Sequence, residues 1–325
     1  MGWTNNRFGI ARETSYGTAV TAGVKGYAAT TEQFDPEMVE NSVPGFRAGR
    51  QGLAESEHSL VLVGGTGSIT VPVPVDENDL LFDGLLGTHT DFAGNAWAEA
   101  TDASGPDEGR TLYMVRGLGL SGSDVERTQY SGAIPTGWSL SVTADGLAEL
   151  TVNYWWKARK TAGLSSVAVS APDAVRPYRW SDATAQLAGA DIAGVTGFTI
   201  DCDLGMDTSL SYLDGQAGRA KPQRTSIPTY TGTIEMVYNS QAQGMFADWL
   251  SGTTRRLALI LTAADYEAAN NVASSIAFTF AAAKFTGSNP VATPESYTTI
   301  SLPFMGMQPA AGNLLAIAAR AKTAA

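Results

Sequence analysis

Several residue types are scarce in this chain, and each scarcity excludes a class of protein. Cys202 is the only cysteine among 325 residues, so no disulfide can form within the chain. One cysteine and two histidines cannot supply the four ligands of a common structural zinc site. No apolar run approaches the roughly 18 residues of a membrane-spanning helix, and the first residues lack a secretion signal pattern. We therefore expect no membrane binding and synthesis in a reducing cytoplasm.

Charged residues are also few, and acidic residues outnumber basic ones. They make up 16% of the chain, whereas about 25% is typical. The net charge is -11, and the longest basic run is Arg255-Arg256. Binding to nucleic-acid phosphates requires clustered Lys and Arg, so this chain is a poor candidate for it. An acidic wall could still let DNA pass without holding it. The low charge fits either a surface covered by neighbours or a neutral soluble protein.

Catalytic and cofactor motifs are incomplete. Residues 117–122 fit the pattern G-x-G-x-x-G, but the residues that follow lack the apolar face of the helix that a dinucleotide site needs. Asp201, Asp203 and Asp207 resemble a calcium loop, but Met206 replaces its turn glycine. The serine elbow Gly-x-Ser-x-Gly is absent. The sequence therefore predicts no catalytic, cofactor-binding or metal-binding residues, and a protein that is not an enzyme.

One segment of the chain is repeated. Thr66-Gly67-Ser68-Ile69 recurs as Thr231-Gly232-Thr233-Ile234, a shift of 165 positions, and the match continues without a gap to Gly87-Thr88 and Gly252-Thr253. Ala48-Gly49-Arg50 is echoed by Ala217-Gly218-Arg219 upstream. A duplicated structural unit that lacks catalytic residues is more typical of a protein that assembles with its own copies than of an enzyme.

Strand patterns dominate the chain. Trp138 to Val142 alternates apolar and polar residues, and Leu147 to Trp155 is its predicted return strand after a turn at Ala144-Asp145-Gly146. Ile276 to Phe280 alternates in the same way, with Tyr297 to Leu302 as a candidate partner. The predicted helices are few and short: one at 76–86, stopped by Gly87, and one at 241–250, ended by Gly252.

These patterns predict two tandem domains of one kind. The first spans 1–175 with an insertion at about 89–108, and the second spans 191–310. Residues 176–190 form the predicted linker. The Ala-rich residues 311–325 are predicted to be a C-terminal arm, either mobile or a short helix.

The chain resembles the tail tube (major tail) proteins of long-tailed bacteriophages. The resemblance lies in Arg12 to Ala19, in the Thr-Gly-x-Ile strand followed by a short helix, and in Phe278 to Phe285 before Pro303-Phe304-Met305-Gly306. It implies mainly β domains of sandwich or half-barrel form, each flanked by a helix. In the family, six such domains form a ring, and rings stack into a hollow tube through which the genome leaves. The resemblance brings no catalytic residues.

Two domains per chain lead us to expect three chains in a pseudo-sixfold ring. The expected partners are the chain itself, a tape measure protein and tail-end proteins, within the virion. DNA would pass through the lumen without specific binding. Like charges repel across a narrow bore, so the candidate lumen residues are acidic: Glu32, Asp201, Asp203 and Glu235. The candidate ring-stacking residues are Arg50 and Arg219, which could instead anchor their own loops.

Two other functions fit parts of the sequence. A different particle component, such as a capsid decoration protein, would also lack catalytic residues. A β-sandwich carbohydrate-binding module would explain some of the seven Trp residues. Microscopy of concentrated protein separates these readings, because only a tube subunit forms stacked rings.

Overall fold

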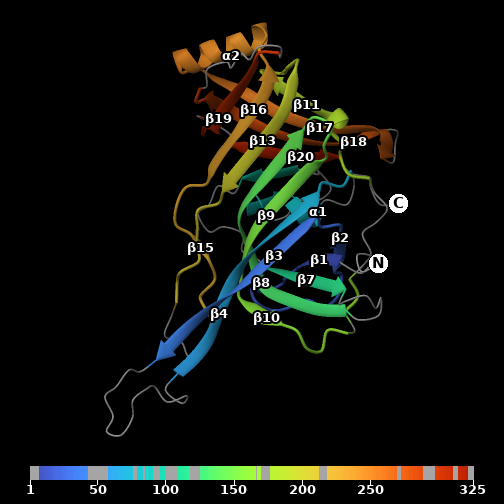
Figure 1. Cartoon of the computed structure of the whole chain (residues 1–325), viewed down its shortest axis with the longest axis vertical. Coiled ribbons are helices and arrows are strands. Elements are labelled where there is room, and N and C mark those ends of the chain that lie inside the picture. The colour runs from blue at the N-terminus through green and yellow to red at the C-terminus, as the bar shows by residue number, and fades with distance from the viewer. Residues whose placement is uncertain are drawn as a thin grey trace.

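The structure is a computed structural model that describes residues 7–42, 58–75, 79–82, 85, 87–90, 96–99, 109–117, 125–165, 167–169, 176–211, 218–268, 272–287, 297–309 and 314–320. Antiparallel strands predominate, as predicted (Figure 1). The first unit contains β1 (Arg7–Arg12), β2 (Lys25–Tyr27), β3 (Thr31–Ser42), β4 (His58–Pro72), β5 (Gly87–Thr90), β6 (Ala96–Glu99), β7 (Arg110–Gly117), β8 (Val125–Thr143), β9 (Ala148–Trp156) and β10 (Ala158–Lys160). The second unit contains β11 (Ala183–Leu187), β12 (Ala190–Asp191), β13 (Val195–Asp203), β14 (Met206–Asp207), β15 (Gln223–Arg224), β16 (Thr229–Val237), β17 (Thr254–Ala268), β18 (Val272–Phe285), β19 (Thr299–Gly306) and β20 (Leu315–Arg320).

The predicted hairpin is confirmed as β8 and β9. Leu140 lies opposite Leu150 and Trp138 opposite Val152, so apolar side chains of both strands share one face. All of them are buried. The turn includes Asp145 at φ 63°, a left-handed conformation that Asp tolerates better than most residues.

Strand pairing repeats between the two units. In the first unit β4 lies between β3 and β9, β9 pairs with β8, and β8 pairs with β7 and β10. In the second unit β16 lies between β13 and β19, β19 pairs with β18, and β18 pairs with β17 and β20. The β1–β2 and β1–β7 pairs recur as β11–β12 and β11–β17. The repeated Thr-Gly-x-Ile segments thus occupy the same place in two sheets of like topology.

The two units are joined by β-pairing as well as by the chain. The second half of β8 pairs with β13 over Gly137 to Thr143, so one sheet runs from β3 through β4, β9, β8, β13 and β16 to β19. We call this sheet the long sheet.

The stretch predicted as a linker is integrated into the fold. Tyr178 is fully buried. Its N–H donates to Val73 O over 2.9 Å, and its carbonyl accepts from Ala148 N over 3.0 Å. A 3-10 helix at Trp180–Asp182 follows, and β11 then pairs with β17. Residues 176–190 therefore include a strand of the second unit, in the place that β1 has in the first.

The predicted C-terminal arm is partly a strand. β20 pairs with β18 from Arg320 opposite Ser275 to Leu315 opposite Phe280, and with β6 of the first unit on its other side. The suggestion of a mobile arm or short helix was therefore wrong for these residues. β20 also takes the place expected for Tyr297 to Leu302, because most of β19 pairs with β16.

The predicted helix at 241–250 is present over its full length, and the one at 76–86 is present in part. α1 spans Asp79–Phe82, and α2 spans Ser240–Ser251 and ends at Gly252 with φ 69°. Asn239 caps α2, because its side chain accepts the Ala242 N–H over 2.9 Å.

We expect the substitution Asn239→Ala to lower the free energy of unfolding by about 1 kcal/mol, the usual cost of a lost N-cap. Urea unfolding measures the change. Asn239→Asp is the matched control, since it keeps the acceptor oxygen and should change stability by less. Equal losses in the two variants would show that the cap does not stabilise α2.

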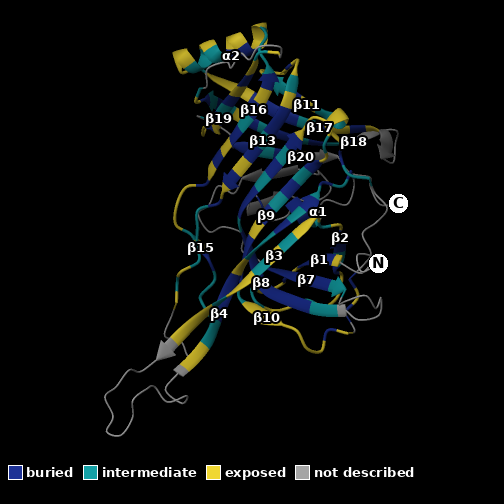
Figure 2. Cartoon of the chain, viewed as in Figure 1, coloured by how far each residue is buried: buried dark blue, intermediate teal, exposed yellow. Residues whose placement is uncertain are grey.

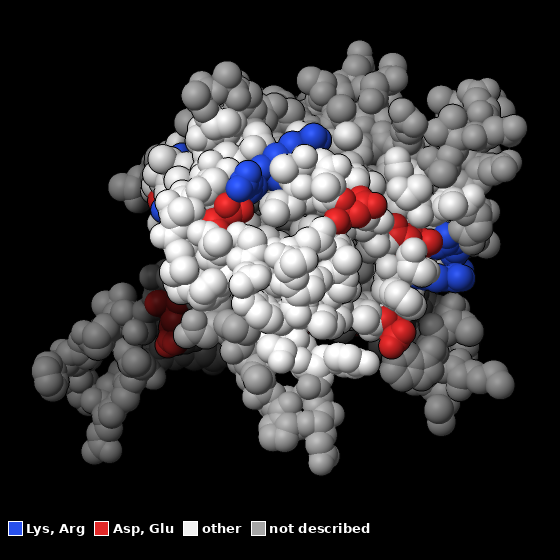
Figure 3. All heavy atoms as spheres, turned by 90° about the horizontal axis from the view of Figure 1, so that it is seen from above, with Lys and Arg blue, Asp and Glu red and all other residues white. Residues whose placement is uncertain are grey.

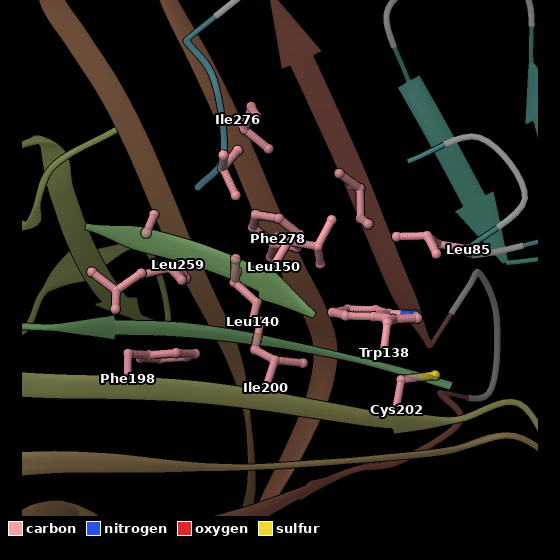
Figure 4. Packing of buried hydrophobic residues seen from close by; sticks show 14 of the residues in the cluster. Leu85, Trp138, Leu140, Leu150, Phe198, Ile200, Cys202, Leu259, Ile276 and Phe278 are labelled. Atoms are coloured by element: carbon pink, nitrogen blue, oxygen red, sulfur yellow. The ribbon is translucent and has the colours of Figure 1, made fainter. Parts of the chain in front are cut away.

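One hydrophobic core continues through both units, and a second, smaller cluster, which includes Tyr113 and Leu164, lies in the first unit. One face of the long sheet packs against strands of a second layer, which makes the architecture sandwich-like (Figure 2). Figure 4 shows Leu140 of β8 and Ile200 of β13 on the side that faces Phe278 of β18 and Leu259 of β17. Burying aliphatic and aromatic side chains stabilises the fold by about 1.5–3 kcal/mol each. The opposite face of the long sheet remains outside this core.

Candidate functional surface

The outer face of the long sheet is polar across both units. Side chains alternate along each strand, so every second residue points away from the core. The exposed and half-exposed residues at these positions form what we call the polar face: Thr31, Gln33, Asp35, Thr66, Ser68, Thr70, Ser139, Ser141, Glu149, Thr151, Asn153, Thr199, Asp201, Asp203, Thr231, Thr233, Glu235, Thr299 and Ser301. No Lys or Arg stands at the described strand positions of this face.

Strand register arranges these side chains in rows across the sheet. One row runs from Thr31 on β3 through Thr70, Thr151, Ser139 and Asp201 to Thr231 on β16. Within it the Thr70 and Thr151 hydroxyls are 2.8 Å apart and share a hydrogen bond. The row crosses the β8–β13 junction without interruption, so the two units present one continuous surface.

Three of the four predicted lumen residues lie together on the polar face. Asp201 and Asp203 are exposed on β13, and Glu235 is exposed on β16. Glu235 is opposite Gly197, where the absence of a side chain leaves its carboxylate room over the sheet. Asp35 and Glu149, which the sequence analysis did not select, extend the acidic character into the first unit.

The fourth predicted residue, Glu32, is on the other side of β3. Its carboxylate forms an ion pair and hydrogen bond with Arg116 of β7. This hydrogen bond raises the pKa of the Arg116 guanidinium. Glu32 is thus engaged within the first unit, and its neighbours Thr31 and Gln33 face outward instead.

Arg219, predicted for ring stacking, contacts its own chain. Its guanidinium is paired with Glu37 of β3 and donates to Thr208 O over 3.0 Å. Its backbone N–H donates to Val63 O of β4 over 3.0 Å. These contacts hold Arg219, a few residues before β15, against the first unit. Arg50, the other predicted stacking residue, lies outside the described residues.

The comparison with known families agrees with this geometry. Residues 3–306 match the family of phage tail tube proteins. The chain belongs to this family. Membership makes it a structural protein of the bacteriophage particle, with a role in a self-assembling tail tube. No curated protein matches the chain.

The opening motif of this tail tube family member surrounds a buried carboxylate. Glu13 is fully buried. It accepts hydrogen bonds from Gly17 N over 2.7 Å, from Thr111 Oγ1 over 2.8 Å and from Gly132 N over 2.8 Å. Gly17 has φ 77°, which favours glycine. Glu13 therefore orders the turn after β1 and ties it to β7 and β8.

The end of the molecule that carries α2 has only scattered charges at its surface. Figure 3 shows this end, where acidic and basic side chains lie among uncharged ones. Among the described residues, no group of His, Cys, Asp and Glu is placed to hold a metal ion. The same part of the chain has no helix both long and apolar enough to cross a membrane.

Proposed function

We propose that this chain is the repeating subunit of the phage tail tube, and that its polar face lines the bore. Copies join into rings around the tube axis, and the rings stack into a hollow conduit for the genome. The chain is made in the host cytoplasm and becomes part of the virion. Its further partners are a tape measure protein inside the tube and proteins at the tail ends.

The main support for this proposal is that the polar face continues across both units. The face offers hydroxyl, amide and carboxylate groups across strands of both units, without Lys or Arg at the described positions. Hydroxyl and amide groups keep a wall hydrated, and carboxylates repel the phosphates of DNA. A surface of this composition suits passage of DNA better than binding of DNA.

The repeated topology supports three chains per ring. Each chain supplies two units with like strand pairing, which we take as its two domains: residues 1–175, and a second beginning at β11. Three chains then provide the six domains of a ring. The prediction that the second domain begins only at 191 is revised by this proposal, because β11 takes part in its sheet.

The projecting end of β3 and β4 is our candidate for contact between rings. Figure 2 shows exposed residues along both strands where they extend beyond the body of the molecule. Met38 is 45% exposed and Leu60 is 53% exposed. An isolated two-stranded ribbon is marginally stable in water, so a neighbouring ring would cover these apolar side chains. The Arg219 ion pair then supports the base of the projection rather than the contact itself.

Electron cryomicroscopy of the concentrated protein tests the proposal. We expect stacked rings with three chains each and with Asp201 and Glu235 facing the bore. Monomers at every concentration, closed shells, or a bore lined by another face would each contradict it.

Charge reversal on the polar face should make the tube retain DNA. We expect tubes of the variant Asp201→Lys/Glu235→Lys to bind labelled single-stranded DNA at low salt and to release it as salt rises, because Lys–phosphate attraction is strongly salt-dependent. Both residues are exposed, so the free energy of unfolding should change by less than about 0.5 kcal/mol. Co-sedimentation of DNA with tubes measures retention.

The control variant is Asp145→Lys/Asp191→Lys, which changes the net charge equally. Both control positions are exposed and lie off the polar face, in the β8–β9 turn and on β12. Equal DNA retention by the two variants would contradict the assignment of the polar face to the bore.

A further inference from the structure

A pocket lies between one end of the long sheet and β11. Its volume is about 270 Å³, and its apolar floor includes Val142 of β8, Phe198 of β13 and Leu259 of β17. Phe198 and Leu259 lie at the same end of the hydrophobic core in Figure 4. None of the described residues that line the pocket carries a charge. The pocket therefore suits an uncharged ligand, because an ion would lose its hydration there without gaining a partner.

The first unit fills the corresponding place with an aromatic ring. Phe8 of β1 lies opposite Met114 of β7, and Ala185 of β11 lies opposite Leu259 of β17. The Phe8 side chain is buried in the core, whereas the much smaller Ala185 lines the pocket. The second unit thus leaves space where the first unit places a phenyl ring.

The next strand of each unit supports this alignment of Ala185 with Phe8. The residue opposite Phe8 on β2 precedes Phe34 by seven positions. Ile192, whose N–H donates to Ala185 O over 2.8 Å, precedes Ile200 by eight positions. Phe34 and Ile200 lie opposite the repeated glycines of β4 and β16, and the β-bulge in β13 accounts for the additional residue.

The rim of the pocket carries a half-exposed aromatic side chain on a well-anchored turn. Trp180 lines the pocket and is 48% exposed, and its N–H donates to Gly146 O over 3.0 Å. The Asp182 carboxylate accepts from Arg176 over 2.6 Å and from the Arg179 N–H over 2.9 Å. The 3-10 helix is therefore held in place before a ligand arrives, which lowers the entropic cost of binding.

The size of the pocket limits the ligand. An apolar cavity of about 150 Å³ is large enough to bind benzene, and pockets for drug-sized molecules measure roughly 300–1,000 Å³. A pocket of about 270 Å³ lies between these sizes. It therefore has room for one aromatic ring or for two fused rings.

We propose that this pocket binds a small uncharged aromatic molecule of one or two fused rings. The ligand takes the place that the Phe8 ring has in the first unit, and it contacts Trp180 at the rim. This site goes beyond the proposed function, because its floor is on the core side of the long sheet and not on the polar face.

Titration calorimetry with indole tests the inference. Indole has two fused rings and no charge, and we expect saturable binding with a dissociation constant of about 0.1–1 mM, as is usual for so small an apolar ligand. Indole-3-carboxylate has the same rings and a negative charge. It should bind at least about tenfold more weakly, because the pocket offers its carboxylate no partner.

Two substitutions locate the binding. Ala185→Phe supplies the ring that the first unit has at this position, and it should weaken indole binding by about tenfold or more, because the space is then filled. Trp180→Ala removes an exposed contact and should weaken binding by about two- to tenfold, the equivalent of one aromatic pair. The matched control is Leu250→Ala, which removes a 69% exposed apolar side chain at the end of α2 and should leave binding unchanged.

Absence of saturable indole binding up to its solubility limit would overturn the proposal. Equal affinity of Ala185→Phe and the parent protein would also overturn it, because indole would then bind elsewhere. If Ala185→Phe does not fold, Trp180→Ala decides, since an unchanged affinity in that variant contradicts the site. Because the titration uses the chain in solution, its result does not depend on whether rings or tubes form.

Discussion

A single methyl group added at Gly232 is expected to lower the free energy of unfolding by about 3 kcal/mol, at the upper end of the cost of overpacking. A Cβ at this position would lie 2.2 Å from Thr199 O and 2.5 Å from Phe304 Cζ. The first contact is with backbone of the paired strand β13, which cannot rotate away. Urea unfolding of Gly232→Ala measures the loss. The clash explains why glycine occurs in both copies of the repeated motif, since a Cβ at Gly67 would lie 2.3 Å from Phe34 Cδ1.

The control for this experiment is Gly244→Ala in α2. No atom lies within 4 Å of a Cβ built at Gly244, and alanine is favoured over glycine inside a helix by about 0.5–1 kcal/mol. The two Gly→Ala substitutions should therefore have opposite effects on stability. Similar stability of Gly232→Ala and the parent protein would mean that the strands separate easily at this point.

Removal of the Glu13 carboxylate should cost still more, about 4 kcal/mol. The variant Glu13→Ala leaves three donors without their acceptor, on Gly17, Thr111 and Gly132. Each buried donor left unsatisfied costs roughly 1–3 kcal/mol, and water that enters the space recovers part of this. Glu13→Gln should lose less stability than Glu13→Ala, because the carbonyl oxygen of Gln still accepts hydrogen bonds. It should not match the parent protein, because the amide nitrogen of Gln would face one of the three donors.

Chemical unfolding measures the stability of both variants and of Asp201→Ala. The comparison separates the effect of losing a buried carboxylate from the effect of losing a negative charge. Asp201 is exposed on the polar face, so its loss should change stability by no more than about 0.5 kcal/mol. A Glu13→Ala variant as stable as Asp201→Ala would show that the turn after β1 does not depend on this carboxylate.

Features set by local pattern could be predicted from the sequence. The β8–β9 hairpin follows from alternation around a turn, and α2 follows from an apolar stripe before Gly252. The duplicated Thr-Gly-x-Ile segment led to two units, and strand pairing repeats as expected. Asp201 and Asp203 were placed on one face of a strand because Ile200, Cys202 and Leu204 alternate with them.

Features set by distant partners could not be predicted. β20 has an Ala-rich sequence, and its strand conformation depends on pairing with β18 and β6. The residues next to Glu13 in the sequence do not indicate that it is buried. Two of its hydrogen-bond donors come from the distant strands β7 and β8, and the third comes from Gly17 in the turn after β1. Glu32 was grouped with Asp201, Asp203 and Glu235, although it lies on the other side of β3. Polar residues occupy both sides of that strand, and only Arg116, far away in sequence, distinguishes the two sides.

The long strand β8 has a mechanical consequence for the proposed tube. β8 pairs with β7 through its first half and with both β9 and β13 through its second half. A force that tilts one unit against the other must break several backbone hydrogen bonds of β13 together, while the peptide chain continues to hold the units. Contacts between chains have no such covalent link. A tube that bends or is stretched should therefore yield between chains, at every second unit boundary around the ring, and the paired units of one chain should move as a rigid block.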